Sequence, residues 1–464
     1  RHYDLGEQAP QAAQYYFLVA QSSFTSGAFK EAAQLCRRAL DCIHRSRERN
    51  VDQDRITVQA VLLLLTAMDT NRQGKANEDE SFSLEKLAQE GVEAAARTGD
   101  KDMLAQAQFA LGRVFVATRS LSSVIEALEA ALKTARESDD RQIEFAILAQ
   151  LGIMVKAQSF DKGQQLVQEA LKIYQDHLAP SPGQKAPLAL ERHFLRMQAF
   201  LGIGEFDHGN LDEAERWLAQ SVAGMSRLGL NDDLLFTYNY LAQVYAGMGQ
   251  FEAAEKSLQD AVRFLKDDPE PNPWRAYDSS FLGKLYLEWN RVEQAAKPIL
   301  EGWKETNAKW NVDLARFPRI YYAELLIHPE YSGCDLKEAR LQLEKAIEEN
   351  ISAGYRDMEI QARSLLARLE LRSGNIARAE NLSLEAVQIL EKEGPWFPAL
   401  RPEEVYYVHS LVMDRAGKHD EASQALEKAK AYVLGKAATL ANPVHRQTFL
   451  ERIPLNTAIL LASP

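Results

Sequence analysis

The sequence predicts an all-α protein built as a solenoid of stacked helical hairpins. A short turn followed by an alanine-rich amphipathic helix recurs along the chain. The copies return with a period of about forty residues, which is typical of helical repeats. Short β-branched alternations joined by hairpin turns, the pattern that strands require, are nearly absent.

The clearest hairpin is predicted within residues 231–266. Its first helix carries Leu241, Ala242 and Tyr245 on one face, at the spacing of an apolar stripe. The break is Gly247-Met248-Gly249, and glycine leaves a helix easily through a positive φ. The second helix places alanines and a leucine on one side, so the two helices can approach closely. One hairpin leaves an apolar face uncovered and therefore needs neighbours like itself.

Other copies share this turn and second helix. With the opening stretch and a degenerate copy over residues 51–97, they make about ten hairpins. We therefore expect one solenoid over residues 1–440. Residues 441–464 contain a short helix interrupted at Pro454, and we expect them to cap the last repeat, because terminal repeats need atypical covering.

Three proline-rich segments interrupt the array, near residues 179–188, 267–274 and 394–402. They are longer than a joint between repeats requires. Tolerated surface insertion is the simpler interpretation. The alternative is that one of them borders a binding site.

The pattern L-A-x-x-Y, then G-x-F-x-x-A, in residues 231–266 resembles the tetratricopeptide repeat at nearly every signature position. The resemblance extends over nearly all of the chain. It implies a right-handed superhelix in which the first helices of successive hairpins line a concave face. The period exceeds the minimal repeat of about 34 residues, so each helix is expected to be longer by about a turn.

The two ends resemble a narrower class. Residues 1–3 with 11–40, and the closing segment 445–460, are similar to the helical sensor arms of bacterial STAND-type signalling ATPases, which include the maltose regulator and ATPase-coupled cyclases. This resemblance implies a cytoplasmic arm that receives a ligand or partner and controls an upstream nucleotide switch. The sequence contains no ATPase, cyclase or DNA-binding module and begins at Arg1, so we expect it to be part of a longer protein.

Composition argues against several classes of partner. The chain has 54 basic and 66 acidic side chains and a formal net charge of -12, whereas nucleic-acid binding requires a basic face. No apolar run approaches the ~20 residues that span a bilayer. The three cysteines lack metal-ligand spacing, and we expect no metal or cofactor.

Catalytic motifs are also missing from the sequence. It contains no phosphate loop, no nucleophile elbow and no zinc-binding H-E-x-x-H. The nine histidines are scattered, and paired carboxylates such as Glu403-Glu404 lie at predicted helix starts, where they complement the macrodipole. We therefore expect a protein that is not an enzyme.

A ligand groove is predicted along the first helices, where inward positions carry amide, basic and aromatic side chains. Such groups hold a peptide's backbone and carboxylates and cover its apolar side chains. Aromatic density favours the middle repeats, and we expect joint replacement of Tyr277 and Lys284 by alanine to weaken binding without unfolding the array. The candidate residues are Phe109, Arg113, Arg196, Phe236, Asn239, Gln243, Tyr277, Lys284, Arg316, Arg319, Tyr322 and Arg368.

Three functional hypotheses follow. The first is the regulatory arm of a larger signalling protein, which binds a peptide or protein partner in its concave groove. The second is a self-standing scaffold or adaptor, and the third is a sensor of a small-molecule inducer. An ATPase in the flanking sequence would support the first. The sequence gives no indication of the oligomeric state.

Overall fold

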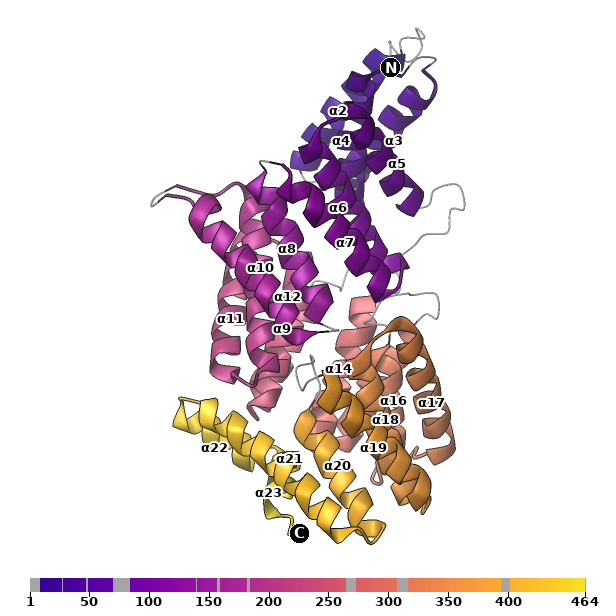
Figure 1. Ribbon diagram of the computed structural model, residues 1–464, viewed down its shortest axis with the longest axis vertical. Helices are drawn as coiled ribbons and strands as arrows, with labels where there is room; N and C mark the ends of the chain where they lie inside the picture. Colours follow the sequence, from indigo (N-terminus) through magenta and orange to yellow (C-terminus); the bar gives the residue numbers. More distant parts are fainter. Residues whose placement is uncertain are drawn as a thin grey trace. The chain divides into compact units, whose positions relative to one another are not determined.

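The computed structural model describes residues 9–463, apart from residues 27, 47–48, 70–83, 139, 157–158, 182–183, 264–272, 307–315 and 394–400. The described residues form α-helices α2 to α23 and one short π-helix, Tyr174–Leu178, and include no strand (Figure 1). No helix in these ranges combines the length and apolarity that crossing a membrane requires. The predicted all-α hairpin solenoid is confirmed.

Twenty of the helices form ten consecutive hairpins. The pairs are α2 (Ala9–Thr25) with α3 (Phe29–His44), α4 (Val51–Asp69) with α5 (Leu84–Thr98), α6 (Lys101–Thr118) with α7 (Leu121–Arg136), α8 (Arg141–Lys156) with α9 (Phe160–Ile173), α10 (Leu188–Asp207) with α11 (Leu211–Leu228), α12 (Asn231–Gly247) with α13 (Phe251–Arg263), α14 (Pro273–Glu288) with α15 (Val292–Glu305), α16 (Phe317–Ile327) with α17 (Leu336–Ala353), α18 (Arg356–Arg372) with α19 (Ile376–Glu393), and α20 (Pro402–Arg415) with α21 (His419–Thr439). Helices α22 (Pro443–Glu451) and α23 (Pro454–Leu461) follow, with the break at Pro454 that the sequence predicts.

Packing divides the chain into two units. The first runs to residue 151 and takes in residues 169–181, and the second takes in residues 152–168 and the described residues from 184 onward. The first unit has its own apolar clusters, one of them around Phe17, Leu40 and Leu64. The candidate site described below lies within the second unit.

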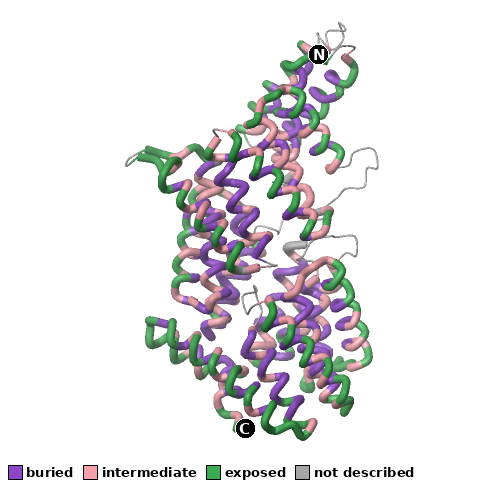
Figure 2. Tube along the Cα trace, viewed as in Figure 1, coloured by how far each residue is buried: buried purple, intermediate pink, exposed green. Residues whose placement is uncertain are grey.

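First and second helices are buried differently. In the second unit α12 contacts its own partner α13 and also the first helices α10 and α14 of the adjacent hairpins. A second helix such as α17 buries one stripe, which includes Ala339, Leu343 and Ala346, and exposes the opposite face (Figure 2). The first helices therefore form the inner layer of the array.

The repeated glycine of the first helices marks close packing. A Cβ atom on Gly283 would lie 2.3 Å from Cγ1 of Ile299 and 2.8 Å from the carbonyl oxygen of Ala295, both on the paired helix α15. A Cβ atom on Gly202 would lie 2.7 Å from Cγ of Leu218 in the equivalent hairpin. Glycine at this position thus lets the two helices of a hairpin approach each other.

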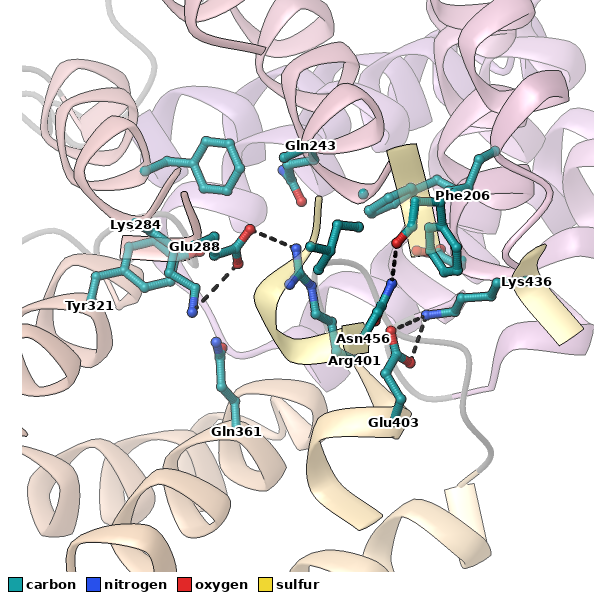
Figure 3. A pocket seen from close by; sticks show the side chains of 17 residues that line it. Phe206, Gln243, Lys284, Glu288, Tyr321, Gln361, Arg401, Glu403, Lys436 and Asn456 are labelled. Atoms are coloured by element: carbon teal, nitrogen blue, oxygen red, sulfur yellow. Dashed lines mark hydrogen bonds and ion pairs between the residues drawn. The ribbon is translucent and has the colours of Figure 1, made fainter. Parts of the chain in front are cut away.

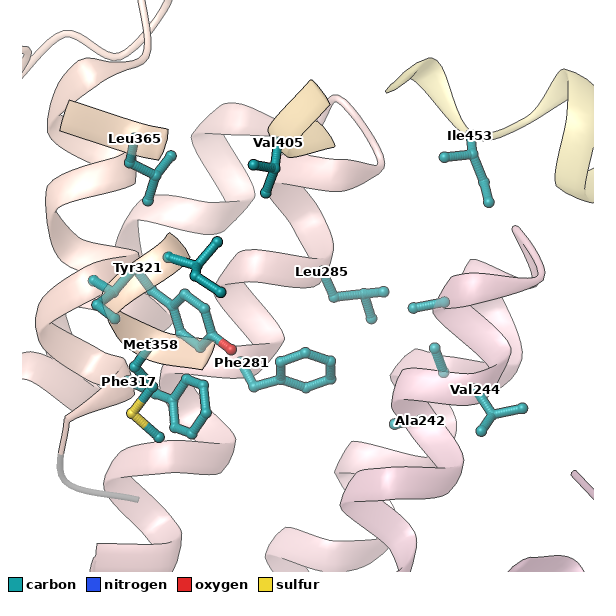
Figure 4. Close-up of a cluster of buried hydrophobic side chains, with 14 of the residues drawn as sticks. Ala242, Val244, Phe281, Leu285, Phe317, Tyr321, Met358, Leu365, Val405 and Ile453 are labelled. Atoms are coloured by element: carbon teal, nitrogen blue, oxygen red, sulfur yellow. The ribbon is translucent and has the colours of Figure 1, made fainter. Parts of the chain in front are cut away.

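The main apolar cluster of the second unit extends from α10 to α23. It includes Phe281 and Leu285 on α14, Tyr321 on α16 and Val405 on α20. Ile453, from the turn between α22 and α23, belongs to the same cluster although it lies far along the chain (Figure 4). The C-terminal helices are therefore part of the core.

The C-terminal segment contacts the α10–α13 region, roughly two hundred residues upstream. Thr439 Oγ1 donates to the carbonyl oxygen of Gly209 (2.8 Å), and Thr448 Oγ1 donates to that of Met248 (2.9 Å). Asp212 accepts from the backbone N–H of Ala441 at 2.6 Å. Helices α22 and α23 also contact α21, so the C-terminal segment joins α21 to the α10–α13 region within the second unit.

Candidate functional site

An internal cavity lies where the inner layer of the second unit meets the C-terminal helices (Figure 3). The cavity has a volume of about 60 Å³, which holds a few water molecules or one small chemical group but not a whole peptide. The lining includes charged and amide side chains from seven helices and the residue before α20. The polar members are Asp207, Gln243, Lys284, Glu288, Gln361, Arg401, Glu403, Lys436 and Asn456.

One side of the cavity carries a chain of ion pairs. Lys284 Nζ lies 2.6 Å from Glu324 Oε1 and 3.5 Å from Glu288 Oε1. The second oxygen of Glu288 lies 2.6 Å from Nη2 of Arg401, the residue that precedes α20. These contacts join α14, α16 and the start of α20 across the hollow of the array.

Two further ion pairs lie on the other side of the cavity. Lys436 on α21 contacts both carboxylate oxygens of Glu403 at 2.8 Å. Lys156 Nζ lies 2.5 Å from Asp207 Oδ2, and the side chains of both residues are buried. Every ammonium and guanidinium group named so far in the cavity wall therefore has a carboxylate partner.

Burial and pairing oppose each other in these groups. Burial alone would raise the pKa of Glu324, but the charges of Lys284 and Arg368 lower it below its ordinary value. Burial alone would lower the pKa of Lys284, but Glu324 and Glu288 raise it. Both residues are therefore charged near neutral pH, and each depends on its partner.

A buried amide–carboxyl cluster supports the wall beside the ion pairs. Gln243 Nε2 donates to Asn239 Oδ1 at 2.8 Å and to Tyr277 Oη at 3.3 Å. Asn239 Nδ2 in turn donates to Asp278 Oδ1 at 2.7 Å. Burial raises the pKa of Asp278 to about 8, against the smaller effect of this hydrogen bond.

The raised pKa of Asp278 makes stability depend on pH. The folded chain keeps a proton on this carboxyl between pH 3.8 and about 8, where the unfolded chain has lost it. Its stabilising contribution is complete below pH 3.8 and is lost as the pH rises to about 8, at up to about 1.4 kcal/mol per pH unit. We expect Asp278→Asn to remove this decline in urea unfolding, and exposed Asp420→Asn to leave it. An unchanged decline in Asp278→Asn would contradict the assignment.

Two acceptors of the lining have no hydrogen-bond partner. They are Asp207 Oδ1 and Gln243 Oε1. The two residues are 8% and 4% exposed, so bulk water does not solvate them freely. A buried acceptor without a partner costs about 1–3 kcal/mol, so these atoms mark places where a donor would bind.

The structure brings five of the twelve predicted residues together. Gln243 and Lys284 line the cavity, and Asn239 and Tyr277 lie directly behind Gln243. Arg368 Nη2 lies 3.8 Å from Glu324, beside Lys284. Tyr277 is only 2% exposed and belongs to the core, so Tyr277→Ala would destabilise the array, and the double replacement is not the clean binding test that the sequence suggested.

Three predicted residues lie toward the second helices. The ring of Tyr322 stacks on Trp303 of α15 at 5.2 Å. Arg319 lies 3.1 Å from Glu349 of α17, and Arg316 donates to the carbonyl oxygen of Glu349 at 3.2 Å. These side chains are therefore not brought to the cavity.

The remaining four lie elsewhere. Phe236 packs against Phe200 with ring centroids 5.5 Å apart, and Arg196 lies 3.5 Å from Asp233. Phe109 and Arg113 lie on α6 in the first unit. Whether any of the twelve residues contacts a partner stays a prediction.

Sequence reasoning missed the partners of the buried cations. Glu403 was assigned to the helix macrodipole, and Arg401 was assigned to a proline-rich loop. A usable signal was present, because Lys284, Glu324 and Arg368 occupy equivalent first-helix positions in successive repeats with alternating charge. Comparing charges between equivalent positions would have predicted the pairing.

Comparisons with known proteins agree with the fold. Residues 194–267 match the family model for the tetratricopeptide repeat. This match covers the part of the array from α10 to α13, and the predicted tetratricopeptide repeat is confirmed there. No curated protein sequence matches the chain.

Several solved structures are similar. A Rap protein complexed with competence and sporulation factor has 11% identity and a TM-score of 0.54, over 93% of this chain and 100% of that chain. The Rap conjugation gene regulator of plasmid pLS20, in complex with the Phr* peptide, has 13% identity and a TM-score of 0.50, over 83% and 96%. A STAND protein with a tetratricopeptide sensor from Pyrococcus horikoshii has 15% identity and a TM-score of 0.48, over 87% and 56%. At these identities the likeness extends to the fold alone.

Proposed function

We propose that the chain is a non-catalytic interaction module that binds a peptide segment of a protein partner at the internal cavity of the second unit. The observation that carries this proposal is the pair of buried acceptors, Asp207 Oδ1 and Gln243 Oε1, that face the cavity without a partner. Tetratricopeptide arrays present their first helices as a binding surface. The pLS20 regulator, which shares the fold, was solved with a peptide bound.

The closed geometry supports a sensing role. A ligand that enters the cavity lies beside the contact between Glu288 and Arg401, which joins α14 to the start of α20. A change at this contact is transmitted to α20 and α21, which continue into α22 and α23. Ligand binding would thus shift the second unit between closed and open arrangements. This is how the chain would act as the regulatory arm of a larger signalling protein.

Selection from a random peptide library against the whole chain tests the proposal. Selected peptides are expected to bind the chain and to lose at least about tenfold in affinity when Gln361→Trp fills the cavity. Gln294→Trp, on the exposed face of α15, is the matched control and should bind as tightly as the unmodified chain. Failure to select any peptide, or equal binding by the two variants, would contradict the proposal.

A further inference from the structure

We propose that the cavity receives the basic head group of a lysine or arginine side chain carried by the bound peptide. This inference rests on the proposed function and names the chemistry of the group that the cavity takes.

The cations of the wall are already engaged. Lys284, Arg401 and Lys436 lie 2.6 Å, 2.6 Å and 2.8 Å from carboxylate oxygens of Glu324, Glu288 and Glu403. A ligand carboxylate would lie beside these glutamates and compete with them for the same cations. A glutamate displaced in this way would be buried without its partner, which is strongly unfavourable. The wall therefore disfavours an anionic group.

The two buried atoms of the lining that have no hydrogen-bond partner are of one kind. Asp207 uses Oδ2 for Lys156, at 2.5 Å, and keeps Oδ1 free. Gln243 uses Nε2 for Asn239 and Tyr277 and keeps Oε1 free. Both atoms are acceptors, so a ligand that supplies donors would satisfy them.

The hydrogen bonds of Asn239 fix the orientation of the Gln243 side-chain amide. Asn239 presents its NH₂ group to Asp278 Oδ1 at 2.7 Å, so its own carbonyl oxygen faces Gln243. Gln243 therefore donates from its NH₂ group to Asn239 Oδ1, at 2.8 Å. The carbonyl oxygen of Gln243 is then directed to the cavity, as Figure 3 shows.

A basic head group matches these requirements best. Ammonium and guanidinium groups donate several hydrogen bonds and accept none. An amide or hydroxyl would bring an acceptor of its own, and the cationic donors of the wall are already paired. The planar guanidinium also presents donors in several directions, which suits two separate acceptors. With about 60 Å³ available, only a head group enters, and the peptide backbone stays outside.

The peptide selection described above provides the test. Binders are expected to share a lysine or arginine at one position. For a synthetic binder, calorimetry should show about tenfold or greater loss of affinity when that lysine becomes norleucine or that arginine becomes citrulline. Binders without a shared basic residue, or equal affinities for the charged and neutral peptides, would overturn this inference while leaving the proposed function intact. Absence of binders would overturn the proposed function itself.

Two variants locate the effect in the cavity. Gln243→Met removes one free acceptor and keeps every ion pair, so the ratio of charged to neutral affinity should fall. Asp207→Asn leaves a carbonyl for Lys156 and directs an NH₂ group to the cavity, so it should reduce the ratio further. Exposed Gln294→Met is the control, with an unchanged ratio. Circular dichroism shows whether Asp207→Asn folds. If it does not, Gln243→Met is the deciding variant, and an unchanged ratio of charged to neutral affinity in Gln243→Met would place the basic group elsewhere.

Discussion

Replacing Lys284 by methionine is expected to lower the free energy of unfolding by about 3–5 kcal/mol, because it leaves Glu324 as a buried charge without its main partner. The two side chains are 10% and 8% exposed, and their charged atoms lie 2.6 Å apart. Chemical denaturation of the variant and the unmodified chain, measured at the same pH, gives the difference.

Two matched variants make the Lys284 result specific. Lys297 lies 3.9 Å from Glu301 on the surface of α15, where the side chains are 81% and 59% exposed, and Lys297→Met should cost no more than about 0.5 kcal/mol. The double variant Lys284→Met, Glu324→Leu should regain most of the loss, because an apolar pair replaces a buried ion pair at little cost. Similar losses in the buried and exposed single variants would contradict the assignment of this pair to the interior.

Replacing Gly249 by alanine is expected to release the C-terminal helices. Gly249 has a φ of 74°, and an added Cβ atom would lie 2.6 Å from the carbonyl oxygen of Thr448 on α22. Neither backbone can yield without separating α22 from the turn between α12 and α13. We expect amide hydrogen exchange in α22 and α23 to accelerate by about tenfold or more, which corresponds to about 1.4 kcal/mol.

Gly374 provides the control for this experiment. It lies in the equivalent turn between α18 and α19 with a φ of 81°, and no atom lies within 4 Å of its added Cβ atom. Gly374→Ala therefore introduces the same backbone strain, about 1 kcal/mol, without the collision. Exchange in α22 and α23 should stay unchanged in that variant. Equal acceleration in both variants would show that strain, and not contact with α22, is responsible.

Much of the fold could be predicted because local sequence patterns determine it. The turn before Phe251, the apolar stripe of α12 and the recurrence of both along the chain define the hairpin and its copies. Local signals of this kind act within one repeat or between neighbours.

The site was harder to predict because it depends on contacts between distant repeats. Asn239, Gln243, Tyr277 and Lys284 were placed correctly on first helices, but their burial was not foreseen. The C-terminal segment that covers this region contacts α11–α13 through Asp212, Met248 and Glu252. Periodicity fixes which face of a helix points inward, but it does not show that the array closes on itself.

The same closure explains why the predicted groove residues separate into two groups. Side chains of α12 and α14 face the enclosed hollow and find partners there, whereas Arg319 and Tyr322 of α16 pack against α15 and α17. The aromatic residues that favoured the middle repeats as the site lie in both of these surroundings. Of the predicted residues, Gln243 and Lys284 belong to the lining of the cavity.

The central claim is that a bound peptide inserts a side chain into the cavity of the second unit, against α12, α14 and the start of α20. Hydrogen exchange of the whole chain, with and without a selected peptide at saturating concentration, tests it most directly. We expect slower exchange at the C-terminal turns of α12 and α14 and in the first turn of α20. Protection confined to the outer faces of α13, α15 and α17, with the inner helices unchanged, would contradict the claim.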